Sequence, residues 1–196
     1  MTFYTEAQVR AEGRRAGSLV HGGVQEALRK SARFDQYDIF LSHSFRDAEV
    51  ILGVKKILEK TGRSVYVDWI DDAQLDRSAV TPETANLLRT RMNQSLSLVY
   101  AHSESSTTSK WMPWELGYFD GHRSGQAIAI MPLVSSASAR PSGQEYLGLY
   151  PRIEELQSDG RQVPYVVRRP AGILEWKSLA DLGRATSSFR RIVNGR

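Results

Sequence analysis

The sequence predicts a doubly wound α/β domain, because short apolar strands alternate with segments of helical periodicity. Strand character, with β-branched and aromatic side chains in short runs, occurs at residues 37–41, 64–69, 96–101 and 127–134. Strands that are so uniformly apolar are typical of a parallel sheet with both faces covered by helices. Right-handed crossovers between the strands would place those helices on the two faces.

Helix signals occupy the intervals between these strands. After the first strand, Ser44 and Asp47 form a start that resembles a capping box, and Gly62 ends the segment. Its apolar residues recur at helical spacing: Val50, Ile51, Val54, Ile57 and Leu58. The Thr-Pro-Glu sequence at residues 81–83 opens a second helix, since proline suits the first turn. A third helix is predicted over residues 111–123.

The hydrophobic pattern is less regular in the C-terminal part of the chain. A Ser/Ala/Pro-rich loop over residues 135–142 precedes a short helix predicted at 144–149. We expect residues 163–168 to form the fifth strand, at a sheet edge where Pro164 is tolerated. Residues 179–193 are predicted to form a final basic helix.

Length and composition fit one globular domain. The chain has 196 residues, of which 41% are hydrophobic and 24% charged. We interpret residues 1–33 as a polar helical extension, accessory to a domain over residues 34–196. The absence of cysteine excludes disulfides, thiolate metal sites and cysteine nucleophiles. Since the sequence shows neither a signal peptide nor a transmembrane run, we expect a cytoplasmic protein with no membrane partner.

The positive charge is concentrated near the C-terminus. The formal net charge is +4, and the residues after position 160 include eight basic and only two acidic side chains. A basic segment can bind nucleic acid, but the interleaved aromatic residues typical of such interfaces are missing. We therefore do not expect nucleic acid as a partner, and we interpret the basic segment as a solvated face.

Candidate site residues follow the predicted strands. In open α/β sheets, ligands bind beyond the carboxyl ends of the strands. The loop after the third strand leads into the helix that contains Trp111 and Glu115, which are four residues apart and share one face. Pro113 must lie in or beside the first helical turn, so Glu115 lies near the helix N-terminus. Free N–H groups there favour an anionic ligand such as a pyrophosphate.

Two motifs resemble those of TIR domains. Residues 37–44, Tyr-Asp-Ile-Phe-Leu-Ser-His-Ser, followed by Arg46-Asp47, resemble the opening strand of the family. Residues 109–116, Ser-Lys-Trp-Met-Pro-Trp-Glu-Leu, resemble its Ser-x-Trp-x-x-x-Glu-Leu stretch. The resemblance covers residues 34–134, and the chain resembles bacterial, NAD-cleaving members such as the TIR component of Thoeris antiphage systems. It implies a flavodoxin-like, doubly wound, mainly parallel five-stranded sheet with helices on both faces.

The resemblance also implies a reaction. Glu115 would be the catalytic carboxylate that cleaves the nicotinamide–ribose bond of NAD+, giving nicotinamide and either ADP-ribose or a cyclic ADP-ribose isomer. NAD+ would be the substrate, with no resident cofactor and no metal. The positions that would approach the ribose, phosphates and rings are Ser42, His43, Ser44, Arg46, Trp69 and Trp111. Expected protein partners are a second copy of the chain, another TIR protein or an effector.

Two other functions remain open from the residues alone. The first is a non-catalytic TIR interaction module, suggested by the basic ends and by an acidic loop at residues 70–80 that lacks the Gly-Pro-like centre of many animal relatives. The second is a nucleoside deoxyribosyltransferase-like enzyme, which also uses a glutamate at an anomeric carbon. Calcium binding is disfavoured because Asp68, Asp71, Asp72 and Asp76 lack the Asp-x-Asp-x-Asp-Gly order. A Ser42-His43-Asp47 triad lacks a nucleophile elbow.

Overall fold

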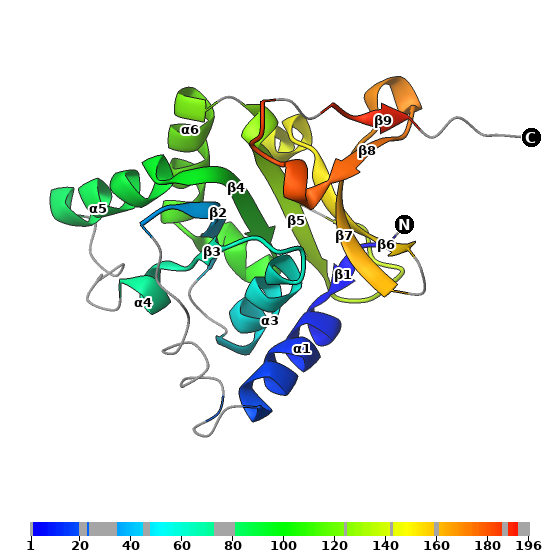
Figure 1. Ribbon diagram of the computed structural model, residues 1–196, viewed down its shortest axis with the longest axis horizontal. Helices are drawn as coiled ribbons and strands as arrows, with labels where there is room; N and C mark the ends of the chain where they lie inside the picture. Colours follow the sequence, from blue (N-terminus) through cyan, green and yellow to red (C-terminus); the bar gives the residue numbers. More distant parts are fainter. Residues whose placement is uncertain are drawn as a thin grey trace, which may run out of the picture.

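The computed structural model describes residues 2–19, 23, 35–44, 48–72, 81–123, 125–141, 143–158, 161–185 and 188–191. Within these ranges one sheet contains nine strands (Figure 1). They are β1 (Tyr4–Thr5), β2 (Tyr37–Ser42), β3 (Val65–Tyr66), β4 (Ser95–His102), β5 (Ile128–Val134), β6 (Arg152–Ser158), β7 (Arg161–Arg168), β8 (Glu175–Ser178) and β9 (Arg190–Arg191). The α-helices are α1 (Glu6–Ser18), α3 (Ala48–Glu59), α4 (Asp68–Asp71), α5 (Pro82–Asn93) and α6 (Trp111–Arg123).

The parallel part of the sheet has flavodoxin-like topology. The strand order is β3-β2-β4-β5-β6, and each of these neighbours pairs in parallel. This corresponds to the 2-1-3-4-5 order of doubly wound sheets, so the predicted fold is confirmed. Beyond β6 the sheet continues with β7, β8 and β9, which pair in antiparallel fashion.

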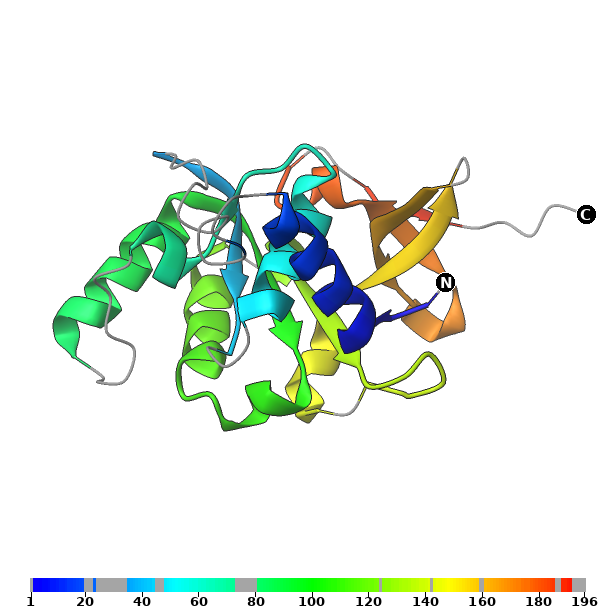
Figure 2. The same ribbon diagram turned by 90° about the horizontal axis from the view of Figure 1, so that it is seen from below.

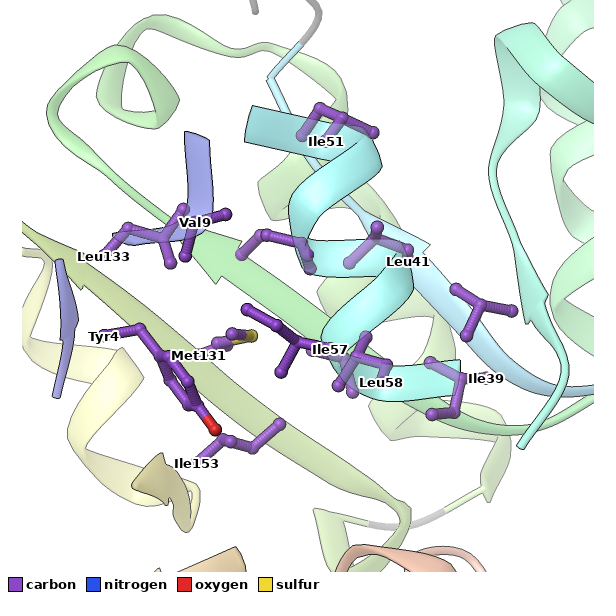
Figure 3. Close-up of a cluster of buried hydrophobic side chains, with 14 of the residues drawn as sticks. Tyr4, Val9, Ile39, Leu41, Ile51, Ile57, Leu58, Met131, Leu133 and Ile153 are labelled. Carbon is purple, nitrogen blue, oxygen red and sulfur yellow. The ribbon is translucent and has the colours of Figure 1, made fainter. Parts of the chain in front are cut away.

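Helices cover both faces of the sheet. Figure 2 shows α1 and α3 on one side and α6 on the other. Alternation along β2 follows this division, because Ile39 and Leu41 join the apolar cluster under α3 while Phe40 joins the cluster under α5 and α6. Figure 3 shows Leu58 of α3 within the first cluster. Among the described residues, no helix is both long and apolar enough to cross a membrane.

The N-terminal segment is integrated into the core more closely than the sequence indicated. Strand β1 pairs with the end of β5, and α1 packs directly on α3. Gly13 and Gly53 make this contact possible, since a Cβ atom on either would lie 1.9 Å from a backbone oxygen of the facing helix. The predicted continuation of this segment after residue 23 lies outside the described residues.

The C-terminal half differs from the prediction in two places. The fifth parallel strand is β6, whereas residues 163–168 belong to β7, which lies between β6 and β8. Pro164 is accommodated because β8 pairs with β7 only from Tyr165 onward, so β7 is locally an edge at the proline. The helix predicted at 179–193 is wrong: its described residues form the 3-10 turn η5 (Leu179–Asp181) and β9.

Smaller differences concern three short elements. The second predicted strand is reduced to β3, because the chain turns into α4 at Asp68. The helix predicted at 144–149 is the 3-10 turn η3 (Glu145–Leu149), and the Ser/Thr-rich loop before α6 contains the 3-10 turn η1 (Glu104–Thr108). The first two residues of the predicted acidic loop, Ile70 and Asp71, belong to α4, and residues 73–80 lie outside the described residues.

Candidate active site

Ser42 and Glu115 meet inside the protein. The Ser42 hydroxyl donates a hydrogen bond of 2.6 Å to Oε2 of Glu115, and both residues are 0% exposed. Alternation along β2 explains the contact, because Ser42 lies on the same face as Phe40, the face that α6 covers. Two segments that are distant in sequence therefore fix one buried carboxylate.

This pair lies at the topological switch point of the sheet. From β2 the chain passes to β3 on one side, while β4 pairs on the other side, and Ser42 is the last residue of β2. Ligands of doubly wound folds bind in the crevice at this point. Helix α6 begins there, with the Met112 N–H donating to the Ser109 hydroxyl at 3.2 Å. Pro113 lies in the first turn, as the sequence predicts.

His43 connects the end of β2 to the start of α4. Its ring is 1% exposed, with Nδ1 at 3.1 Å from the Leu41 carbonyl and Nε2 at 3.6 Å from Oδ1 of Asp68. The carbonyl contact requires a proton on Nδ1, since a carbonyl oxygen only accepts. These contacts hold the ring against the protein framework directly beside Ser42.

Trp111 is packed into the protein rather than presented as an open platform. It is 7% exposed, and its ring meets Trp114 edge to face with centroids 5.4 Å apart. Trp114 in turn stacks on Tyr118 at 5.8 Å, and the Arg89 guanidinium lies 5.3 Å from the Trp114 ring. An aromatic ladder thus runs along α6 next to the turn that contains Glu115.

The structure describes the other expected substrate-binding residues only in part. Ser44 follows His43 and is partly exposed. Arg46 lies outside the described residues. Trp69 lies in α4, after β3, and only its backbone is described.

Comparison with known proteins identifies the family. No family model matches the chain. A curated relative from Bacillus cereus (strain MSX-D12), named probable 3′ cyclic ADP-D-ribose synthase ThsB′, is 55% identical over 131 residues, which are 66% of this chain and 67% of the relative. The chain belongs to the Thoeris-type bacterial TIR family. The putative cyclic ADP-D-ribose synthase TIR2 of Cytobacillus dafuensis is 37% identical over 83 residues, covering 42% of this chain and 22% of that relative.

Tyr100 is a site residue of this TIR domain that the sequence analysis missed. It pairs with Ser42 across β2 and β4, and it is 1% exposed. Burial raises the pKa of its hydroxyl well above the usual range, with further contributions from a hydrogen bond to Tyr146 and from the charge of Glu115. Side chains along β4 alternate between the two faces of the sheet, and this alternation could have placed Tyr100 on the face that Glu115 covers. A tyrosine in an apolar strand gives no other indication of a site residue.

The aspartates at the start of the acidic loop have structural partners in the TIR fold. Asp71 accepts hydrogen bonds from the Tyr37 hydroxyl at 2.9 Å and from the Val67 N–H at 2.7 Å, while burial raises its pKa. Asp72 forms a two-pronged ion pair with Arg91 at 2.7 and 2.8 Å. Among the described residues, no group of three His, Asp or Glu side chains is arranged to hold a metal ion.

Proposed function

We propose that this TIR domain cleaves the nicotinamide–ribose bond of NAD+ and converts the remainder into a cyclic ADP-ribose isomer, acting in the cytoplasm in Thoeris-type antiphage signalling. The observation that carries the proposal is the buried carboxylate of Glu115, fixed by Ser42 at the switch point of the sheet. The names of the two relatives support the same reaction class.

The chemistry requires one carboxylate. Nicotinamide is already cationic in NAD+, so it departs with the bonding electron pair without a general acid and leaves an oxocarbenium-like ribose. The Glu115 carboxylate stabilises the developing positive charge electrostatically. An adenosine hydroxyl then forms the new bond to the anomeric carbon and loses its proton, which closes the ring; attack by water gives ADP-ribose instead.

Substrate access requires a change at the Ser42–Glu115 contact, because Glu115 is completely covered. In this proposal, the ribose hydroxyls replace the Ser42 hydroxyl as donors to the carboxylate. Ser44, His43 and Arg46 would then face the ribose and phosphates, with Trp69 and Trp111 next to the rings. Self-association, or binding to another TIR or effector protein, would supply the rearrangement.

The decisive experiment incubates NAD+ with the full chain at high protein concentration and follows the products by chromatography with mass detection. We expect Glu115→Gln to reduce nicotinamide release by about 100-fold or more, because the charge is lost while the shape is kept. Glu83→Gln is the matched control, since Glu83 lies exposed in the first turn of α5. Intact NAD+ in every assembly state would favour the non-catalytic interaction module.

A further inference from the structure

A cavity lies at the other end of the sheet from Glu115. It has a volume of about 600 Å³, within the range of small-molecule sites. Its walls come from η2 (Gly125–Ala127) and η3, from the start of β6, and from the end of β7 with η4 (Pro170–Gly172). Strand β5 begins here, whereas Ser42 and Glu115 lie at the carboxyl ends of the parallel strands.

The cavity is lined by three arginines, Arg152, Arg168 and Arg169. Two nearby carboxylates neutralise only part of this charge. Arg169 forms a two-pronged ion pair with the buried Glu154, and Arg168 shares Glu175 with Arg191 at 2.7 and 2.8 Å.

Arg152 is the uncommitted cation of the set. Among the described side chains it forms no ion pair, and its guanidinium lies 6.0 Å from the ring of Phe3. A partly exposed guanidinium in a cavity wall can bind a phosphate through two parallel hydrogen bonds. The cavity wall therefore contains more positive charge than its neighbouring carboxylates neutralise.

The rest of the lining is apolar and aromatic. Leu149 is 79% exposed at the rim, and Tyr150, Pro151 and Phe189 complete this wall. The Tyr150 hydroxyl donates to Asp120 at 3.0 Å, which fixes the position of the Tyr150 ring. A simple anion would leave this apolar wall exposed, whereas an anion attached to a flat ring would cover it.

The loop at the rim is strained. Ala171 in η4 has φ of 50°, and among the described residues it is the one non-glycine residue with positive φ. Such backbone conformations cost about 1–3 kcal/mol and cluster at ligand-binding positions. This observation agrees with a ligand site but does not define its occupant.

We propose that this arginine cavity, lined by Arg152, Arg168, Arg169, Tyr150 and Phe189, is a nucleotide-binding site separate from the Glu115 site. The phosphates bind the Arg152 guanidinium beside the ion-paired Arg168 and Arg169. The base lies against Leu149 and the Tyr150 ring, since the Arg168 guanidinium already lies 4.0 Å from the ring of Phe189. The proposal does not rest on NAD+ cleavage, since it concerns binding at residues that take no part in that reaction.

Isothermal titration of the full chain with ADP tests the proposal, with inorganic pyrophosphate as the probe for phosphate alone. We expect Arg152→Ala to weaken ADP binding about ten-fold or more, since charged hydrogen bonds are lost while no ion pair is broken. Arg15→Ala is the control, because it removes the same charge at an exposed position of α1. This variant should bind ADP as the wild type does. Thermal unfolding of both variants verifies that the fold is kept.

The outcomes separate the alternatives. Loss of ADP binding in Arg152→Ala, with pyrophosphate binding much more weakly than ADP, supports the site. Equal binding of pyrophosphate and ADP would overturn the nucleotide assignment, because the ring would contribute nothing. ADP binding that Arg152→Ala leaves unchanged, or no ADP binding, would overturn the site itself. None of these results depends on whether the protein cleaves NAD+.

Discussion

The Ser42 hydroxyl lies 2.6 Å from Oε2 of Glu115, although 73 positions separate the two residues in the chain. Neither is exposed, so the hydrogen bond is made where water does not compete with it. A buried carboxylate without donors would be costly. The contact therefore links the stability of the fold to the position of the group that we propose to be catalytic.

Replacing Ser42 with alanine should lower both the stability of the fold and the rate of NAD+ cleavage. Ser42→Ala removes a donor from the buried carboxylate, and we expect the free energy of unfolding to fall by about 1–3 kcal/mol. We also expect slower nicotinamide release, because the Glu115 carboxylate is no longer held in one position. Urea unfolding and the chromatographic assay measure the two effects on the same preparation.

Ser97→Ala is the control for this variant. Ser97 is buried in β4, where its hydroxyl donates to the Asp38 carbonyl at 2.7 Å. Its loss should lower stability but leave NAD+ cleavage unchanged. Equal loss of activity in the two serine variants would contradict a specific role for Ser42.

The contact between α1 and α3 predicts a large effect of a single methyl group. In Gly53→Ala, the new Cβ would lie 1.9 Å from the Val9 carbonyl oxygen, so the helices must separate. We expect a loss of about 1–3 kcal/mol of unfolding free energy, typical of overpacking. Gly121→Ala, where the new Cβ meets nothing within 4 Å, should instead stabilise α6 by about 0.5–1 kcal/mol. Similar unfolding midpoints for both variants would contradict the packing argument.

Local signals explain what the sequence predicted well. The bounds of α6 and the place of Pro113 follow from helical spacing and from the conformational limits of proline. Strand β4 follows from its apolar run. The sequence predicts Ser42 and Glu115 at the same edge of the sheet. Ser42 follows the first predicted strand, and Glu115 lies near the start of the helix that follows the third. Their hydrogen bond depends on the tertiary position of α6, which no local pattern contains.

Long-range pairing explains what was missed. Strand β1 has only two residues, and its partner in β5 lies more than a hundred positions away. Glu175 and Lys177 are buried in β8, although the charge of the segment after residue 160 suggested a solvated face, and Glu154 is likewise buried in β6. Arg168 of β7 pairs with Glu175, and Arg169, directly after β7, pairs with Glu154; these partners come together only when the strands are assembled.

Tyr146 should influence the site through Tyr100. Tyr146 hydrogen-bonds with Tyr100, and its own hydroxyl donates to Gln144. In Tyr146→Phe the buried Tyr100 hydroxyl loses this partner, so we expect a loss of about 1 kcal/mol of stability. We also expect a reduced kcat for nicotinamide release, because Tyr100 lies beside Glu115. Tyr118→Phe, which loses an exposed contact with Asn93, should leave kcat unchanged; an equal reduction there would contradict the route through Tyr100.

Glu175 predicts a pH-dependent contribution to stability. Arg191 and then Arg168 hold the pKa of this carboxyl below its usual value of 4.5. Because the folded pKa is lower than the unfolded one, the stabilisation is present above pH 4.5 and is lost as the pH falls through the folded pKa. Glu175→Gln should therefore be less stable than the wild type at pH 7, with a difference that shrinks below pH 4.5. Denaturant unfolding at stepwise lower pH, with the exposed Glu83→Gln as control, measures this difference. A difference that persisted unchanged below the folded pKa would mean that Glu175 acts through packing rather than through its charge.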